Sequence, residues 1–165
     1  MDALIRRAWS VRAHAHAPYS RFRVGAALET EDGSIFVGVN VENASFGLTV
    51  CAERNAVAAA VAAGHRRFTR IAIATEAELA TPPCGACRQV LAEFAPELEV
   101  YSEVPDQRSM WHLDELLPAR FAADGLPVPS TADAPSGEGT SSPVTPEPTP
   151  GYDAKTTTHG STIKG

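Results

Sequence analysis

The 165-residue sequence has few basic residues, few cysteines and no long apolar run. Its 14 lysines and arginines are fewer than its 20 acidic residues. The net charge of −6 argues against binding to a polynucleotide backbone or an anionic membrane surface. No stretch of roughly 18 apolar residues is present to span a bilayer, and the first residues lack the apolar core and cleavage site of a secretion signal. We therefore expect a cytoplasmic protein that has neither a membrane nor a nucleic-acid partner.

Only three cysteines occur, at positions 51, 84 and 87. An odd number cannot pair completely within one chain, and disulfides are rare in a reducing compartment. A single cysteine is commonly a small buried hydrophobic residue. Here, however, Glu53 follows Cys51 by two residues, and Cys84 and Cys87 form a P-C-x-x-C motif, so metal binding is the better interpretation.

Hydrophobic periodicity and turn residues predict an α/β domain over residues 1–125. Asp32 and Gly33, between two apolar runs, are typical of a β-hairpin, whose strands are antiparallel. Farther along, strands alternate with helices, which indicates parallel pairing and a mixed sheet with helices on its faces. The predicted elements are, in order, a helix at 2–14, strands at 22–30 and 35–39, a helix at 51–64, a strand at 70–75, a helix from residue 84, a strand at 98–102 and a helix at 113–117.

Residues 126–165 differ from the rest of the chain in composition. Seven of the 13 prolines lie from Pro127 onward, among Ser, Thr, Gly and Asp and with almost no large apolar side chains. Such a segment buries too little surface to offset the entropy lost on ordering it. We therefore expect a disordered tail over these residues.

The three cysteines stand where the predicted helices at 51 and 84 begin. Backbone N–H groups and the positive end of a helix dipole stabilise thiolates there, and the thiolate is the form that binds metal. Three cysteine ligands leave one position open on a tetrahedral zinc ion, which is typical of catalytic rather than structural sites. A closed structural site would need a fourth ligand, and the sequence leaves His112 open as a candidate.

Charge around the metal points to further residues. Three thiolates on Zn²⁺ carry a net negative charge, which opposes the Lewis acidity that a catalytic zinc needs. Arg54 and Arg88 each directly follow a site residue, and we infer that at least one donates hydrogen bonds to a thiolate sulfur. The alternative for either is a surface cation. Glu53, in the first turn of its helix, suits the helix dipole in any case. Beside an open zinc position, it is also placed to move protons.

Four sequence blocks carry a family resemblance. They are PYSRFRVGAA (18–27), NVENASF (40–46), CAERNA (51–56) and PCGACRQVL (83–91). C-x-E combined with P-C-x-x-C is the three-cysteine form of the zinc deaminase signature. In this order, over roughly residues 1–121, the blocks resemble the small cytidine deaminases of pyrimidine salvage.

The resemblance implies a three-layer α/β/α sandwich with a five-stranded mixed sheet, assembled as a homotetramer with active sites at subunit interfaces. It implies one Zn²⁺ per subunit, held by Cys51, Cys84 and Cys87, with Glu53 as the proton shuttle. The implied reaction is the hydrolytic deamination of cytidine and 2′-deoxycytidine to uridine and 2′-deoxyuridine with release of ammonia.

The same resemblance implies the substrate contacts. Asn40 and Glu42 match positions that hydrogen-bond the ribose hydroxyl, the backbone at Ala52 would contact the pyrimidine, and Phe22 would pack against the base. An ordinary core position is the alternative for Phe22. Phe46 departs from the family, which often has Tyr there, so a hydroxyl hydrogen bond across the subunit interface would be absent.

Three other functions fit parts of the sequence. A deaminase of the same fold that acts on a modified cytosine, such as blasticidin S, would share the zinc motif, but Asn40 and Glu42 favour ordinary nucleosides. Editing of polynucleotides conflicts with the acidic composition and the lack of a basic groove. A non-catalytic zinc-stabilised binding module predicts a fourth ligand and explains neither Glu53 nor the 40–46 block.

Overall fold

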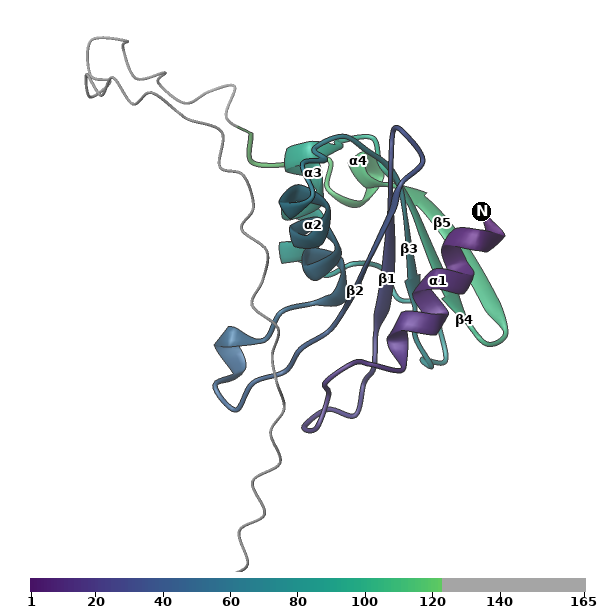
Figure 1. The fold of residues 1–165 in the computed structure, drawn as a ribbon, viewed down its shortest axis with the longest axis vertical. Coiled ribbons are helices and arrows are strands. Elements are labelled where there is room, and N and C mark those ends of the chain that lie inside the picture. Colours follow the sequence, from purple (N-terminus) through teal and green to yellow (C-terminus); the bar gives the residue numbers. More distant parts are fainter. Residues whose placement is uncertain (123–165) are drawn as a thin grey trace, which may run out of the picture. The chain divides into compact units, whose positions relative to one another are not determined.

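The computed structural model describes residues 1–122, and the tail expected at 126–165 lies outside the described residues. The described part contains one five-stranded sheet with strand order β2-β1-β3-β4-β5 (Figure 1). Its strands are β1 (Gly25–Thr30), β2 (Ile35–Val39), β3 (Phe68–Ala74), β4 (Glu99–Val104) and β5 (Gln107–His112). The helices are α1 (Asp2–Arg12), the short 3₁₀ helix η1 (Phe46–Leu48), α2 (Ala52–Ala62), α3 (Gly85–Phe94) and α4 (Leu113–Leu116).

The sheet is mixed, as the sequence predicts. β1 pairs antiparallel with both β2 and β3, while β3 and β4 are parallel and are connected through α3. β5 returns antiparallel beside β4. The parallel pair places the loop before α3 at the same edge of the sheet as the carboxyl end of β3. This is the edge at which crossover connections of α/β folds carry their functional residues.

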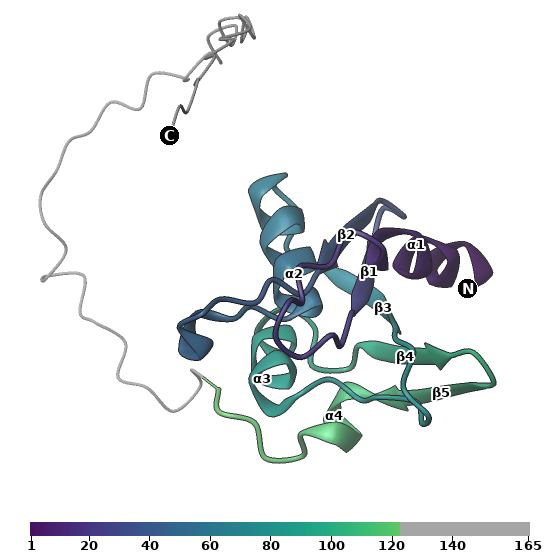
Figure 2. The ribbon, with the colours of Figure 1, turned by 90° about the horizontal axis from the view of Figure 1, so that it is seen from below.

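Helices cover both faces of the sheet. Alternating residues of β1 and β3 point to opposite sides, so the two faces have separate cores. α1 packs on one face through Leu4, Ile5 and Ala8, and α2 and α3 pack on the other (Figure 2). The expected three-layer α/β/α sandwich with a five-stranded mixed sheet is therefore confirmed. No helix within residues 1–122 combines the length and the hydropathy of a membrane span.

Strand β5 is the strand of the described sheet that the apolar pattern did not reveal. It is an edge strand in which only Trp111 packs against the core, while Arg108 and Met110 lie on the other side of the strand and are both exposed. A two-residue turn at 105–106 joins it to β4. Because an edge strand with one weakly buried face has little hydrophobic alternation, its residues resemble a loop in the sequence.

Gly38 allows α2 to lie very close to the sheet. This residue of β2 faces the first turns of α2, where a Cβ atom would lie 2.3 Å from the carbonyl oxygen of Ala52 and 2.4 Å from the backbone nitrogen of Ala56. Both contacts are with backbone, which cannot turn aside as a side chain does. The bare backbone of Gly38 therefore sets the depth at which the N-terminal end of α2 sits.

Candidate active site and metal centre

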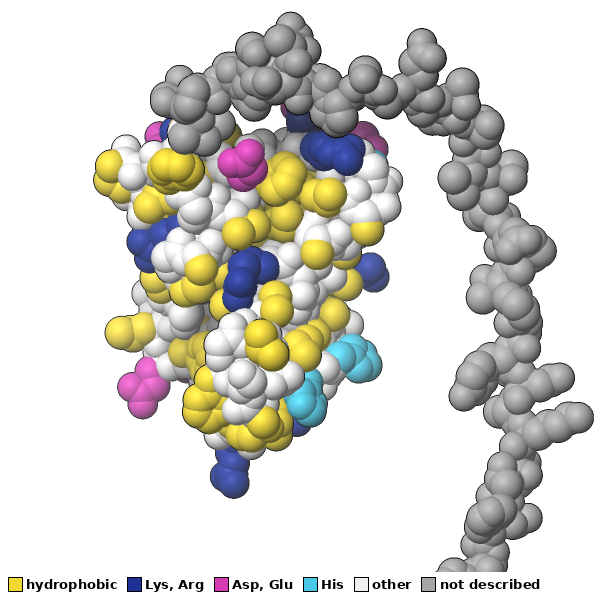
Figure 3. Space-filling view, turned by 90° about the vertical axis from the view of Figure 1, so that its left-hand side faces the viewer, with side chains coloured by type: hydrophobic (Ala, Val, Ile, Leu, Met, Phe, Trp, Pro, Cys, Tyr) yellow, Lys and Arg dark blue, Asp and Glu magenta, His cyan; other side chains and the backbone are white. Residues whose placement is uncertain are grey.

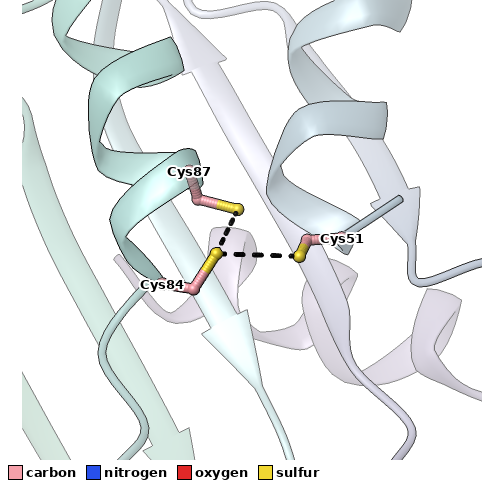
Figure 4. Close-up of side chains that lie close together, drawn as sticks. All are labelled: Cys51, Cys84 and Cys87. Carbon is pink, nitrogen blue, oxygen red and sulfur yellow. Dashed lines mark hydrogen bonds between the residues drawn. The ribbon is translucent and has the colours of Figure 1, made fainter. Parts of the chain in front are cut away.

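Three sulfur atoms meet at the N-terminal ends of two helices (Figure 4). Cys51 is the N-cap residue of α2, Cys84 is the N-cap residue of α3, and Cys87 lies in the first turn of α3. The Sγ atom of Cys84 is 3.8 Å from that of Cys51 and 3.5 Å from that of Cys87. Cys51 and Cys84 are 33 residues apart in the sequence. They meet because α2 and α3 pack on the same face of the sheet.

These separations fit a tetrahedral zinc ion. Zn–S bonds of about 2.3 Å at tetrahedral angles place sulfur atoms about 3.8 Å apart, whereas a disulfide would bring them to about 2.05 Å. Within residues 1–122, Cys51, Cys84 and Cys87 form the only cluster of three or more possible metal-binding side chains. His112, the candidate fourth ligand from the sequence, lies at the start of α4 and is not in the cluster. The described residues thus supply three ligands and leave a fourth position open.

Electrostatics at the cluster favours thiolate. Hydrogen bonds to the Cys51 sulfur lower the pKa of Cys51 to about 5. The larger effect comes from the Cys87 thiol and the smaller one from the Arg54 guanidinium. Nη2 of Arg54 lies 3.9 Å from the Cys51 sulfur and donates to the carbonyl oxygen of Thr49 at 3.1 Å. Nε of Arg54 is buried and has no hydrogen-bond partner among the described residues. A cation is therefore held beside the sulfurs, where it offsets the negative charge of three thiolates.

Arg88 has a different place. Its Nε donates to the carbonyl oxygen of Pro83 at 2.8 Å, and its Nη1 donates to the carbonyl oxygen of Leu116 at 2.8 Å. It thus holds the turn before Cys84 against the end of α4. The sequence predicts that at least one of these two arginines donates to a thiolate sulfur. Arg54 makes that contact, whereas Arg88 donates to backbone carbonyls.

A cavity of about 280 Å³ opens directly in front of the cysteines. Cys51 and Cys84 line it, while Cys87 is fully buried behind them. The structure brings all the other residues that we expected to contact substrate or move protons to the same cavity. These residues are Phe22, Asn40, Glu42, Ala52 and Glu53.

Glu53 is the buried carboxyl group of the cavity. It lies in the first turn of α2, and only 5% of its surface is exposed. Burial raises the pKa of Glu53 above its ordinary value, because a carboxylate loses hydration there. A carboxyl group whose pKa moves toward neutrality is suited to both accept and release a proton. Its position in the first turn of the helix that Cys51 caps places it beside the metal ligands.

Asn40 and Glu42 both hold the chain segment that precedes β1. The side-chain oxygen of Asn40 accepts from the backbone nitrogen of Val24 at 2.8 Å, and its nitrogen donates to the carbonyl oxygen of Phe22 at 2.8 Å. Glu42 accepts from the backbone nitrogens of Tyr19 and Ser20 at 2.9 and 3.2 Å. Phe22, 41% exposed, is therefore a cavity residue held by its backbone and not an ordinary core residue.

Several cavity residues were not singled out from the sequence. Ser20, Thr49 and Thr75 all contribute to the lining, and each carries a hydroxyl group. Ser20 lies inside the PYSRFRVGAA block, so the block could have pointed to it. A serine after Pro18 is equally typical of a turn, however, and the sequence did not separate the two roles. Thr49 and Thr75 come from separate loops, and no local pattern connects them to the cysteines.

Comparison with known proteins agrees with this geometry. Residues 1–103 match the family model described as the cytidine and deoxycytidylate deaminase zinc-binding region. A cytidine deaminase of Halalkalibacterium halodurans is 46% identical over 125 residues, which cover 74% of this chain and 95% of the relative. A probable cytidine deaminase of Dictyostelium discoideum is 45% identical over 130 residues, which cover 76% of this chain and 86% of the relative.

The fold leads to the same family. The crystal structure of cytidine deaminase from Burkholderia pseudomallei matches with a TM-score of 0.70 and 48% sequence identity, covering 73% of this chain and 98% of that one. The family-model match includes all three cysteines and Glu53. The chain therefore belongs to the cytidine and deoxycytidylate deaminase family and carries its zinc-binding region.

Proposed function

We propose that the protein is a zinc-dependent hydrolase that converts cytidine and 2′-deoxycytidine to uridine and 2′-deoxyuridine, with release of ammonia. The observation that carries the proposal is that a buried carboxyl group and a three-cysteine cluster with an open position face one cavity. The curated relatives named cytidine deaminase support the same substrate. The cavity is near the lower end of the usual size range for ligand sites, which suits a nucleoside.

The lining of the cavity divides into a sugar end and a base end. We assign Asn40 and Glu42 to the sugar hydroxyls, because both present polar atoms to the cavity at the end of β2. We assign Phe22 and the backbone of Ala52 to the pyrimidine ring. Ala52 is fully buried as the first residue of α2, so its backbone can approach the base closely beside Glu53.

Cys51, Cys84 and Cys87 would hold Zn²⁺, and when bound it supplies a Lewis acid that lowers the pKa of a water molecule. Glu53 accepts a proton from the water that attacks C4 of the pyrimidine and delivers a proton to N3. Glu53 then takes the remaining proton from the oxygen that has bonded to C4 and transfers it to the exocyclic nitrogen; the C4–N bond breaks, ammonia leaves, and the C4 oxygen becomes the carbonyl of uridine. Arg54 stays beside the sulfur of Cys51 throughout and balances its charge.

We also propose that the enzyme works in pyrimidine salvage in the cytoplasm. Free cytidine and deoxycytidine arise when nucleic acids are degraded, and their deamination returns the base to the uracil pool. Three thiols within 4.8 Å of one another would be prone to oxidation elsewhere, and a reducing compartment preserves them.

A homotetramer is the assembly that we propose. Large hydrophobic side chains are exposed beside the cavity, and Figure 3 shows hydrophobic side chains gathered over the lower part of the face on which η1 lies. Phe46 is 73% exposed and Leu48 is 66% exposed, while Tyr19 packs edge-to-face on Phe46 with ring centroids 5.6 Å apart. Exposed apolar residues of this kind next to a site support a contact between subunits there.

Sedimentation analysis tests the assembly. We expect a particle of about 70 kDa, four copies of the 17.4 kDa chain. We expect Phe46→Asp to lower this mass, because a charge would then be buried at the contact. A wild-type mass of one chain at micromolar concentration would contradict the proposal.

Loss of absorbance in the cytidine band tests the reaction. Purified protein of measured zinc content is mixed with cytidine. We expect the absorbance to fall at an initial rate proportional to the enzyme concentration. The fall should stop on removal of zinc by a chelator and return when zinc is added. No change with zinc fully bound would reject cytidine as the substrate, and blasticidin S would then be the next compound assayed.

A further inference from the structure

The hydroxyl group of Ser20 connects two of the residues that we assign to the substrate. Ser20 Oγ donates a hydrogen bond to Oε1 of Glu42, and the backbone N–H of Phe22 donates to Ser20 Oγ at 3.0 Å. A hydroxyl group has one proton, so accepting from Phe22 leaves that proton free to point at Glu42. The contact fixes the direction of the hydroxyl as well as its position.

Both carboxylate oxygens of Glu42 are held by the same short segment. Oε2 accepts from the backbone nitrogens of Tyr19 and Ser20, and Oε1 accepts from the Ser20 hydroxyl. Hydrogen bonds to a charged acceptor are roughly twice as strong as those between neutral groups. Of the three donors, only the hydroxyl can be removed by a side-chain substitution, because the other two belong to the backbone.

The local backbone explains why Ser20 reaches the cavity. Arg21 has a φ of 59°, in the left-handed region that few residues other than glycine adopt, and its N–H donates to the carbonyl oxygen of Ala17 at 3.1 Å. The hydrogen bond closes a turn over residues 17–21, and the left-handed conformation of Arg21 redirects the chain at the end of this turn. Both residues on either side of Arg21 thereby line the same cavity.

We propose that Ser20 is a positioning residue for the sugar of the nucleoside, acting by holding the Glu42 carboxylate in the orientation that binds the 3′ hydroxyl. The proposal rests on the proposed function, because it concerns how that substrate is bound. Ser20 does not touch the reacting atoms, which lie at the other end of the cavity beside Glu53. Its effect therefore belongs in substrate binding and not in the chemical step.

Steady-state kinetics of Ser20→Ala on two substrates tests the proposal. For cytidine we expect KM to rise about tenfold, because the variant loses one hydrogen bond to a charged group. We expect kcat to change less than about threefold. For 2′,3′-dideoxycytidine, which has no 3′ hydroxyl for Glu42 to bind, we expect KM of the variant to stay within about threefold of wild type. Ser20→Thr, which keeps the hydroxyl, should restore cytidine binding, and Ser10→Ala on the exposed side of α1 should change nothing.

The outcomes separate this inference from the proposed function. A wild-type protein that does not deaminate cytidine would reject the function. An active wild type with equal KM changes for both substrates in Ser20→Ala, or with none, would reject the role of Ser20. A measurement without turnover is the NMR titration of Glu42: the Ser20 hydroxyl lowers its pKa, so Ser20→Ala should raise it toward the ordinary value, and an unchanged pKa would also contradict the proposal.

Discussion

Replacing Glu53 with Gln is expected to reduce kcat for cytidine by about 10⁴-fold, the upper end of the range for general acid–base catalysis, because the carboxyl group transfers protons twice in each turnover. Gln is nearly the same size and fills the same buried position, but it cannot accept and release a proton. Zinc content should stay at one ion per chain, since Glu53 is not part of the cysteine cluster. Kinetics together with metal analysis of the same preparation measures both effects.

Glu93→Gln is the matched control for this change. Glu93 lies on α3, the other helix that carries zinc ligands, but its side chain is exposed. Removal of its charge should leave kcat within about twofold, as is usual for surface substitutions. A Glu53→Gln variant with more than a tenth of wild-type kcat would contradict the proton-transfer role. Loss of zinc from that variant would instead indicate that Glu53 supports the metal.

Gly38→Ala should have a large effect although Gly38 lies outside the cavity. The added methyl group would lie 2.3 Å from the carbonyl oxygen of Ala52, so α2 must move away from β2. We expect the free energy of unfolding to fall by about 3 kcal/mol, the upper part of the usual range for overpacked cores. The gain of about 0.5–1 kcal/mol from replacing a flexible glycine is too small to offset this loss.

The same displacement should impair catalysis. Cys51 and Glu53 sit at the end of α2 that the methyl group pushes, and a shift of about 1 Å at reacting groups costs about a hundredfold in rate. Urea unfolding at fixed protein and zinc concentrations measures the stability, and zinc content and kcat report the movement of the site.

Gly47→Ala is the control for a general effect of adding a methyl group. A Cβ atom at Gly47 meets nothing within 4 Å, and this glycine lies in the exposed helix η1. We expect its zinc content to match wild type and its unfolding free energy to stay within about 1 kcal/mol. Because Phe46 and Leu48 belong to the proposed interface, sedimentation of this variant must also give the wild-type mass. Wild-type stability and activity in Gly38→Ala would show that α2 is not positioned by its close approach to β2.

The fold class followed from local patterns because helices and strands leave different periodicities in a sequence. The Asp32-Gly33 turn predicted the β1–β2 hairpin, and the strands and helices after it predicted parallel pairing, which the β3–β4 pair confirms. β5 could not be predicted in this way, since an exposed edge strand has little apolar alternation. Only the family resemblance implied five strands.

By itself, the sequence determined the chemistry available to this protein: three thiols that stand at the starts of two helices, a carboxyl group two residues after one of them, and a fold class. These are local properties, because helix ends, residue spacing and periodicity involve neighbours along the chain. Tertiary structure alone decided which residues meet. It brought Cys51 within 3.8 Å of Cys84, placed Arg54 rather than Arg88 beside a sulfur, and turned the Ser20 hydroxyl toward Glu42. Contacts between distant segments depend on how the helices pack on the sheet, and residue order alone does not specify that packing.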